Sequence, residues 1–399
     1  MSRTLIASIA GVALAAGAPA LAQPQAPVFD SAAGPYRVVT VAEGLDGPWS
    51  MAFLPDGDML LTEKVGRLRI VRDGVLQPEP IAGTPEVRAS GQGGLLDVAL
   101  HPEFENNRLV YLSFSKPNAD GSEGTTAVVR GRLDGQRLID VEEIFEAQAW
   151  GTTGGHYGSR LAFDDEGYLF ITIGDRMQPS EPGTLESHGA QDLSNHRGTI
   201  VRLHDDGRVP EDNPFVGQAN ALPEIWSYGH RSPQGLTFHP ETGDLWESEH
   251  GPQGGDELNL ILPGRNYGWP VVGYGREYGG TPIHAAIRRD DMEEPIHYFT
   301  PSIGTSGLAV YSGDAFPQLQ GQVLMGGLVG RQLALVPLDG EDLQRVGRIR
   351  DPLLREYGQR IRDVRQGPDG FIYVAIDDRQ GGGLTEIVRL EPAADEGSL

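Results

Sequence analysis

The chain contains no cysteine among its 399 residues. That absence excludes disulfide bonds, thiolate metal ligands and cysteine nucleophiles. Positive charge is also scarce, because 32 Lys and Arg residues stand against 56 Asp and Glu residues, for a formal net charge of −24. Nucleic-acid-binding proteins need a basic surface, so the composition argues against that class. An acidic surface is compatible with cation binding, but it identifies no partner.

Long apolar runs and helical patterns are also rare. Beyond the N-terminal segment no apolar run approaches about 18 residues, so we expect no membrane span in the mature chain. Windows with apolar residues at positions i, i+3, i+4 and i+7 are interrupted by glycine or proline. The sequence has no phosphate loop, no Rossmann fingerprint and neither of the motifs G-x-S-x-G and H-E-x-x-H, so a tightly bound nucleotide is not indicated.

The first 22 residues have the three parts of a secretory signal peptide. Met1–Arg3 is a short basic start, Leu5–Leu21 is apolar and rich in alanine, and Ala20–Ala22 fits an A-x-A cleavage site. The alternative is a buried N-terminal helix. We therefore expect a periplasmic or secreted protein. The expected boundaries are a signal peptide at 1–22, a Pro-rich leader at 23–35, one domain at 36–392 and a flexible tail at 393–399.

Glycine and proline are abundant instead, with 55 and 29 residues dispersed through apolar segments. They punctuate a repeated unit of an apolar strand, a Pro/Asp/Gly turn and a second apolar strand, which is a hairpin signal. Six such repeats, lengthened by inserts at 176–195 and 274–295, predict an all-β fold, a six-bladed β-propeller. The expected strand pairs are 49–54 with 58–63, 95–100 with 109–115, 161–163 with 168–173, 236–238 with 244–248, 308–311 with 323–326, and 364 with 371–376.

Two short segments offer polar groups beside glycines. In the segment 91–97 the glycines allow close approach of the backbone to a ligand, and Gln92 could orient a polar substrate. A tight turn with an exposed glutamine is the alternative. In the segment 154–176, glycines flank His156, whose ordinary pKa suits a general base near neutral pH. Asp175, one hairpin later, could orient the imidazole; a surface histidine and a turn aspartate are the alternative.

The segment 224–270 concentrates further groups of this kind. Arg231 is a planar, permanently charged donor that suits an oxyanion or a quinone-type carbonyl. Carboxylates and backbone carbonyls follow in a turn-rich span, and Ca²⁺ accepts such hard oxygen ligands in irregular loops. The alternative is an acidic turn without a metal. The candidate groups are Gly251, Pro252, Asp256, Glu257 and Tyr267.

Near the C-terminus, Arg360 and Arg362 lie two residues apart in a predicted strand. Residues two apart in a strand project to the same side. Two guanidinium groups on one face suit a ligand with several carboxylates. The alternative is a pair of cross-strand salt bridges.

Together these segments resemble a known family. GQGGLLDVALHP, GGHYGSRLAFDDEGYLFITIGDR, SYGHRSPQGLTFHP, EHGPQGGDELNLILPGRNYGWP and RIRDVRQGPDG are similar to the soluble dehydrogenases of aldoses and glucose that depend on pyrroloquinoline quinone (PQQ), within the glucose/sorbosone dehydrogenase family. The resemblance runs from about Gly44 to Leu390. It implies oxidation of an aldose at C1 to the lactone, hydride transfer to C5 of PQQ at the channel mouth, a Ca²⁺ beside the cofactor and an external electron acceptor.

The resemblance also implies a role for each residue that matches a motif. His156 resembles the base for the C1 hydroxyl, Asp175 its supporting acid, and Gln92 a partner of the substrate or the histidine. Arg231 resembles the cation at the quinone oxygens. The implied Ca²⁺ ligands are the carbonyls of Gly251 and Pro252 beside the cofactor, and Glu257 and Tyr267 at a second, structural ion; Arg360 and Arg362 resemble the pair that holds the PQQ carboxylates.

The chain departs from the family pattern at three places. Ser232 stands where the family usually has asparagine, and His250 where glutamine is frequent. Val329 occupies the region of a PQQ-binding lysine, and Arg331 could reach the same carboxylate. Ser232, His250, Asp256 and Arg331 thus join the expected cofactor-binding residues. The alternatives are a Ca²⁺-dependent propeller lactonase or hydrolase, and a non-catalytic glycan-binding propeller; we expect a monomer or a homodimer.

Overall fold

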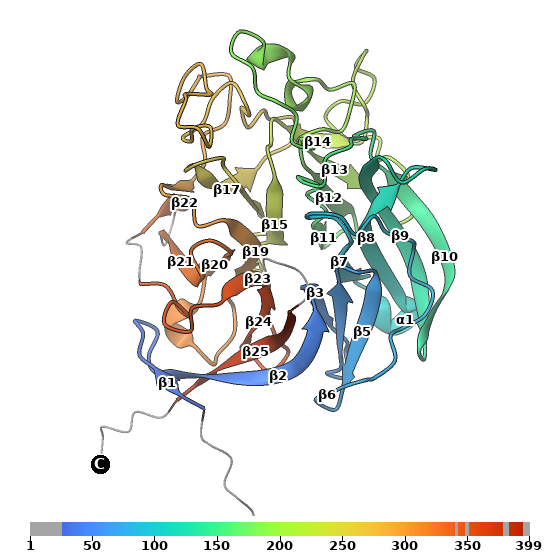
Figure 1. Ribbon diagram of the computed structural model, residues 1–399, viewed down its shortest axis with the longest axis vertical. Coiled ribbons are helices and arrows are strands. Elements are labelled where there is room, and N and C mark those ends of the chain that lie inside the picture. The colour runs from blue at the N-terminus through green and yellow to red at the C-terminus, as the bar shows by residue number, and fades with distance from the viewer. Residues whose placement is uncertain (1–25, 340–341, 348–350, 378–382, 394–399) are drawn as a thin grey trace, which may run out of the picture.

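The computed structural model describes residues 26–339, 342–347, 351–377 and 383–393, so the predicted signal peptide lies outside the described residues, as does the predicted tail after residue 393. Six β-sheets stand in a ring around a central axis (Figure 1). The one α-helix among the described residues is the single-turn α1 (Phe104–Asn107). The predicted all-β, six-bladed β-propeller is confirmed.

Five blades are four-stranded sheets built in chain order. The first has β3 (Pro48–Phe53), β4 (Met59–Glu63), β5 (Arg67–Arg72) and β6 (Val75–Leu76). The second has β7 (Leu95–Leu100), β8 (Leu109–Pro117), β9 (Gly124–Asp134) and β10 (Arg137–Glu146). The third has β11 (Leu161–Phe163), β12 (Leu169–Ile173), β13 (Thr199–Leu203) and β14 (Ile225–Tyr228).

The fourth and fifth blades follow the same plan. The fourth has β15 (Pro233–Phe238), β16 (Leu245–Glu249), β17 (Asp256–Ile261) and β18 (His297–Phe299). The fifth has β19 (Thr305–Val310), β20 (Gln322–Gly327), β21 (Gln332–Asp339) and β22 (Asp342–Val346). Three short 3₁₀ helices lie in the connections: η1 (Leu185–Ser187), η2 (Gly189–Gln191) and η3 (Pro317–Leu319).

The sixth blade closes the ring with strands from both ends of the chain. Its order is β1 (Val28–Phe29), β2 (Tyr36–Asp46), β25 (Leu384–Pro392), β24 (Ile372–Asp377) and β23 (Arg360–Gln366). Strands β2 and β25 pair antiparallel from Tyr36 opposite Pro392 to Asp46 opposite Leu384. Pairing the two ends within one blade holds the ring shut and covers backbone groups that would otherwise form an exposed sheet edge.

The innermost strands β3, β7, β11, β15, β19 and β23 pack against one another in succession around the axis. The six predicted strand pairs are the two inner strands of each blade, and the apolar core fills the spaces between blades. In five blades the inner pair shifts register near the start of its first strand. Such bulges redirect side chains beside functional sites. Within the described ranges, no helix has the length and apolar character needed to cross a membrane.

Candidate functional site

His156 and Asp175 form a buried pair at the start of the third blade. His156 precedes β11 with a φ of 50°, a left-handed conformation that is uncommon for residues other than glycine. Its Nδ1 lies 2.6 Å from Asp175 Oδ1, and Asp175 Oδ2 accepts a 2.8 Å hydrogen bond from Trp269 Nε1. Gly174 allows this approach, because a Cβ there would lie 2.3 Å from the His156 carbonyl oxygen. The predicted pairing of the two side chains is present.

Electrostatics fix the charge state of this pair. Burial lowers the pKa of His156 below its ordinary value, and Asp175 opposes that shift while Arg231 adds to it. Burial acts to raise the pKa of Asp175, but His156 and Arg231 outweigh it and hold that pKa below its ordinary value. The carboxylate is therefore ionised and accepts the Nδ1 proton of a neutral imidazole. That tautomer leaves Nε2 as the basic nitrogen.

Gln92 and Arg231 hold the surroundings of the histidine. Gln92 Oε1 accepts a hydrogen bond from the backbone nitrogen of His156 at 2.8 Å, so Gln92 is a partner of the histidine. The carbonyl of Arg231 accepts from the backbone nitrogen of Asp175 at 2.8 Å. Arg231 Nη1 donates to the carbonyls of His250 and Gly251, each at 3.0 Å, and its guanidinium carbon lies 5.2 Å from the Trp269 ring centre.

His250 lies close enough to Arg231 and to Arg362 to feel the charge of both. Burial, together with repulsion from Arg231 and Arg362, lowers its pKa to about 3, so the ring is neutral. Ser232 and Asp256, both predicted to bind cofactor, are buried and bonded within the protein. Ser232 Oγ accepts from Gln234 Nε2 at 3.3 Å. Asp256 accepts backbone N–H groups, and these bonds fix the loop that carries Gly251; the donors are Gly251 at 3.0 Å, Gly304 at 2.6 Å and Thr305 at 3.1 Å.

The predicted metal ligands share one cleft. Gly251, Pro252, Glu257 and Tyr267 all line it. The Tyr267 hydroxyl donates to the Leu260 carbonyl at 2.5 Å and accepts from the Leu262 nitrogen at 2.9 Å. That hydroxyl is thus committed to the backbone, which leaves the main-chain carbonyl as the oxygen of Tyr267 suited to a Ca²⁺.

Arg360 and Arg362 project to the same side of β23, because both reach Asp377. Arg360 Nε lies 3.0 Å from Asp377 Oδ2, and Arg362 Nη2 lies 3.6 Å from Oδ1. Arg360 also donates to the carbonyl of Leu328 at 2.9 Å. By contrast, Arg331 is exposed and donates to the Gly358 carbonyl at 3.4 Å, and the neighbouring Val329 is 68% exposed.

Lys64 and Asp377 lie beside Arg360 and Arg362, although neither was predicted from the sequence. Lys64 Nζ donates to the carbonyl of Gly91 at 2.9 Å. Burial lowers the pKa of Lys64, repulsion from Arg362 and Arg360 adds to that shift, and Asp377 opposes it. Three cations therefore gather around one carboxylate. Lys64 directly follows β4 in the first blade and Asp377 ends β24 in the sixth, so no local pattern links either one to the arginines.

The fold and the site define a class: a six-bladed propeller with a histidine–aspartate pair and a basic cluster at the start of its inner strands. The family model for glucose/sorbosone dehydrogenases matches residues 45–389. The chain therefore belongs to the glucose/sorbosone dehydrogenase family, a family of oxidoreductases that act on sugars.

Individual relatives agree with this assignment. The chain is 42% identical to an aldose sugar dehydrogenase of Escherichia coli over 361 residues, covering 89% of this chain and 93% of that protein. A crystal structure of a glucose dehydrogenase superposes with a TM-score of 0.82 at 44% identity, covering 90% and 99% of the two chains. The PQQ-bound aldose sugar dehydrogenase of Streptomyces coelicolor superposes with a TM-score of 0.71 at 28% identity, covering 89% and 98%.

Proposed function

We propose that this protein is a PQQ- and Ca²⁺-dependent aldose dehydrogenase that oxidises the sugar at C1 to the lactone and passes electrons to an external acceptor. The observation that carries the proposal is the neutral, buried His156 held by Asp175 beside Arg231. The predicted signal peptide supports action in the periplasm or outside the cell.

His156 is the general base of the proposed reaction. The Asp175 carboxylate fixes the ring orientation and directs Nε2 toward the substrate hydroxyl. As Nε2 takes the hydroxyl proton, the ring becomes an imidazolium, and the adjacent carboxylate stabilises that charge. The Trp269 N–H holds the other oxygen of Asp175 and prevents it from turning away.

Arg231 provides positive charge beside the His156–Asp175 pair. Nη1 is fixed by two carbonyls, while Nε is buried and has no hydrogen-bond partner among the described residues. A fixed cation with an unused donor suits an oxygen on which negative charge develops. PQQ, when bound, supplies the quinone that accepts the hydride.

The basic cluster of Lys64, Arg360 and Arg362 fits the carboxylates of such a cofactor. The carboxylate of Asp377 compensates all three cations, and Asp46 adds an attraction to Lys64, so positive charge remains in excess among these described residues. Within the described part of the chain, Arg362 Nε is also buried without a partner. In a protein of net charge −24 a surplus of cations at one position indicates an anionic ligand. Lys64 would thus supply a charge that Val329 cannot.

The proposed Ca²⁺ also has suitable oxygens. The carbonyls of His250 and Gly251 converge on one cationic nitrogen of Arg231. A carbonyl oxygen has two lone pairs, so Gly251 can serve both Arg231 and a cation in the adjoining cleft. The Pro252 carbonyl would join Gly251 at this ion, whereas Glu257 and Tyr267, which also line the cleft, would hold the second, structural Ca²⁺.

Reconstitution tests the proposed function. Purified apoprotein is loaded with Ca²⁺, titrated with PQQ and assayed by dye reduction with a panel of aldoses. We expect saturation at one PQQ per chain and aldose-dependent turnover. Absence of both PQQ binding and turnover would refute the proposal. Lactone cleavage by PQQ-free protein would support a hydrolase instead, and a protein that binds glycans without either reaction would be a non-catalytic propeller.

A further inference from the structure

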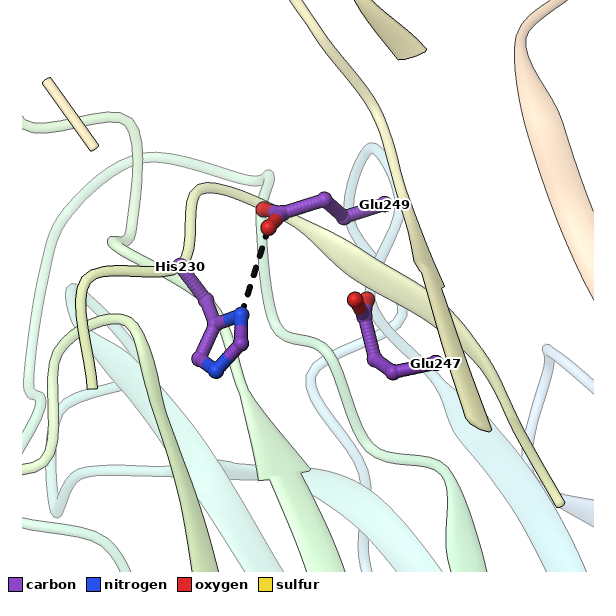
Figure 2. A group of neighbouring side chains, drawn as sticks. All are labelled: His230, Glu247 and Glu249. Atoms are coloured by element: carbon purple, nitrogen blue, oxygen red, sulfur yellow. Dashed lines mark hydrogen bonds and ion pairs between the residues drawn. The ribbon is translucent and has the colours of Figure 1, made fainter. Parts of the chain in front are cut away.

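Three buried side chains behind Arg231 form a cluster that the proposed reaction does not use. Glu247 and Glu249 lie two residues apart on β16 and face His230, which comes from the connection between β14 and β15 (Figure 2). Glu247 and His230 are 0% exposed, and Glu249 is 3% exposed. One nitrogen or oxygen atom from each residue lies within 4.8 Å of the others. This spacing allows all three to contact a single ion.

The neighbouring strand adds two more polar groups to the same face of the sheet. In the register of β16 and β17, Glu247 stands opposite Asn259 and Glu249 opposite Glu257. Asn259 Nδ2 lies 3.0 Å from Glu247 Oε2, 3.3 Å from Glu249 Oε1 and 3.5 Å from Glu257 Oε2. Three carboxylates thus surround one neutral amide.

Glu249 is held in place by several neighbouring nitrogen atoms. It accepts hydrogen bonds from the backbone nitrogens of Arg231 and Ser232, and its Oε1 lies 3.2 Å from His230 Nδ1. Glu247 adds a second carboxyl group to the same face of β16. Burial, followed by repulsion from Glu249, raises the pKa of Glu247 well above its ordinary range.

Glu247 is not satisfied in either protonation state. Its Oε1 is buried and has no hydrogen-bond partner among the residues that the structure describes. An ionised Glu247 would need a cation there, and a protonated one would need an acceptor for its O–H; the described chain supplies neither. Within the same ranges, Asn259 Oδ1 is also buried without a partner. Rotation of that amide by half a turn would place Oδ1 among the carboxylates as a neutral ligand.

We propose that His230, Glu247 and Glu249 bind one divalent transition-metal ion of the Mn²⁺ type, with Asn259 as a further oxygen ligand. Carboxylate and amide oxygens suit Mn²⁺, and the imidazole nitrogen shifts the preference away from Ca²⁺. The ion takes the place of the proton between His230 Nδ1 and Glu249 Oε1. Because Glu249 also holds the backbone of Arg231, the ion fixes the loop that carries this arginine. None of these four residues is an expected Ca²⁺ ligand, but the site adjoins the expected ligands, because Glu249 lines their cleft and Asn259 contacts Glu257.

The test measures Mn²⁺ binding in the presence of excess Ca²⁺, which occupies the expected calcium sites. Chelator-treated protein is titrated with MnCl₂, and free aqueous Mn²⁺ is followed by its electron paramagnetic resonance signal. We expect one Mn²⁺ per wild-type chain. Glu247→Gln, which keeps the side-chain size, should weaken binding by more than about 10-fold. The matched control is Glu241→Gln, an exposed glutamate in the turn before β16, which should bind like the wild type.

Melting temperatures give a second measurement on the same proteins. Mn²⁺ should raise the melting temperature of the wild type and of Glu241→Gln, but not that of Glu247→Gln. If Glu247→Gln does not fold, His230→Gln replaces it in both measurements. The proposal is overturned if Ca²⁺ abolishes Mn²⁺ binding in the wild type, or if the cluster variant and the control bind Mn²⁺ equally well.

Discussion

Replacing Arg160 by methionine should destabilise the fold more than any exposed ion-pair substitution. Arg160 belongs to what we call the axial ion network, which also contains Asp97, Asp363 and Arg365. Arg160 Nη2 lies 2.9 Å from Asp363 Oδ1 and Nη1 lies 3.4 Å from Asp97 Oδ1. Arg365 bridges the same aspartates at 3.0 and 3.1 Å. Arg160 and both aspartates are 1% exposed or less, and the network joins strands of different blades.

The expected loss follows from the charge balance of this network. Two arginines neutralise two aspartates, so Arg160→Met leaves one arginine for both. Removing one partner of a buried ion pair costs about 3–5 kcal/mol, because the remaining charge is uncompensated. Arg160 Nε also donates to the Gln234 carbonyl at 2.6 Å, and that bond is lost as well. With an unfolding entropy of ~0.8 kcal/mol/K for 399 residues, the melting temperature should fall by roughly 4–6 °C.

Urea unfolding followed by circular dichroism, with calorimetry for the melting temperature, measures the effect. The control is Arg132→Met, which removes a 2.7 Å pair with Asp140 whose side chains are 47% and 71% exposed. Such exposed pairs contribute about 0–1 kcal/mol. If both variants lose less than about 1 kcal/mol of unfolding free energy, the argument that Arg160→Met leaves a buried charge uncompensated is refuted.

Three further predictions concern the reconstituted enzyme. In the wild type, kcat/KM should fall with decreasing pH only below the ordinary histidine pKa of about 6.5, because burial lowers the pKa of His156. An acid limb of the pH profile with its midpoint above that value would contradict the proposed role of His156. Asp175→Asn should lower kcat by about 10²–10⁴-fold. It should also move the acid limb of the pH profile to lower pH, because the carboxylate no longer stabilises the imidazolium form of His156. An acid limb at the same pH as in the wild type would indicate that Asp175 has only a structural role. Lys64→Met should weaken PQQ binding by about 10-fold or more in a fluorescence titration. Lys116→Met, which removes a partly exposed lysine paired with Glu143 and Glu146, should not. Equal PQQ affinities of the two variants would exclude Lys64 from the cofactor site.

The six inner hairpins could be predicted because their signals are local. Asp-Gly and Pro-Asp turns between apolar runs specify a hairpin without reference to the rest of the chain. The outer strands carry weaker patterns: β10 is largely exposed and β6 has two residues. Strand β1 lies in the segment expected to be a leader. Ring closure by β2 and β25 joins the two ends of the chain, and no local pattern encodes that pairing.

The candidate site shows the same division. The His156–Asp175 pair could be predicted, since both residues lie in one blade and follow a recognisable motif. Lys64 could not, because it meets Arg362 only through the contact between the first and sixth blades. A sequence signal did exist for the proposed metal site: Glu247 and Glu249 alternate along one strand, as do Glu257 and Asn259 along the next. Reading both strands by their period of two would have placed all four on one face.

The axial ion network also links stability to the geometry of the site. Arg160 follows His156 by four residues, and its Nη2 lies 3.4 Å from the carbonyl of Arg362. Asp363, which pairs with Arg160, directly follows Arg362 in β23. His156 and the basic cluster are therefore both close in the chain to residues of this one buried network. Loss of the Arg160 side chain should displace both His156 and Arg362. Arg160→Met should therefore weaken PQQ binding, although Arg160 lies outside the basic cluster. A destabilised Arg160→Met protein with unchanged PQQ affinity would show that the blades set the site without this network.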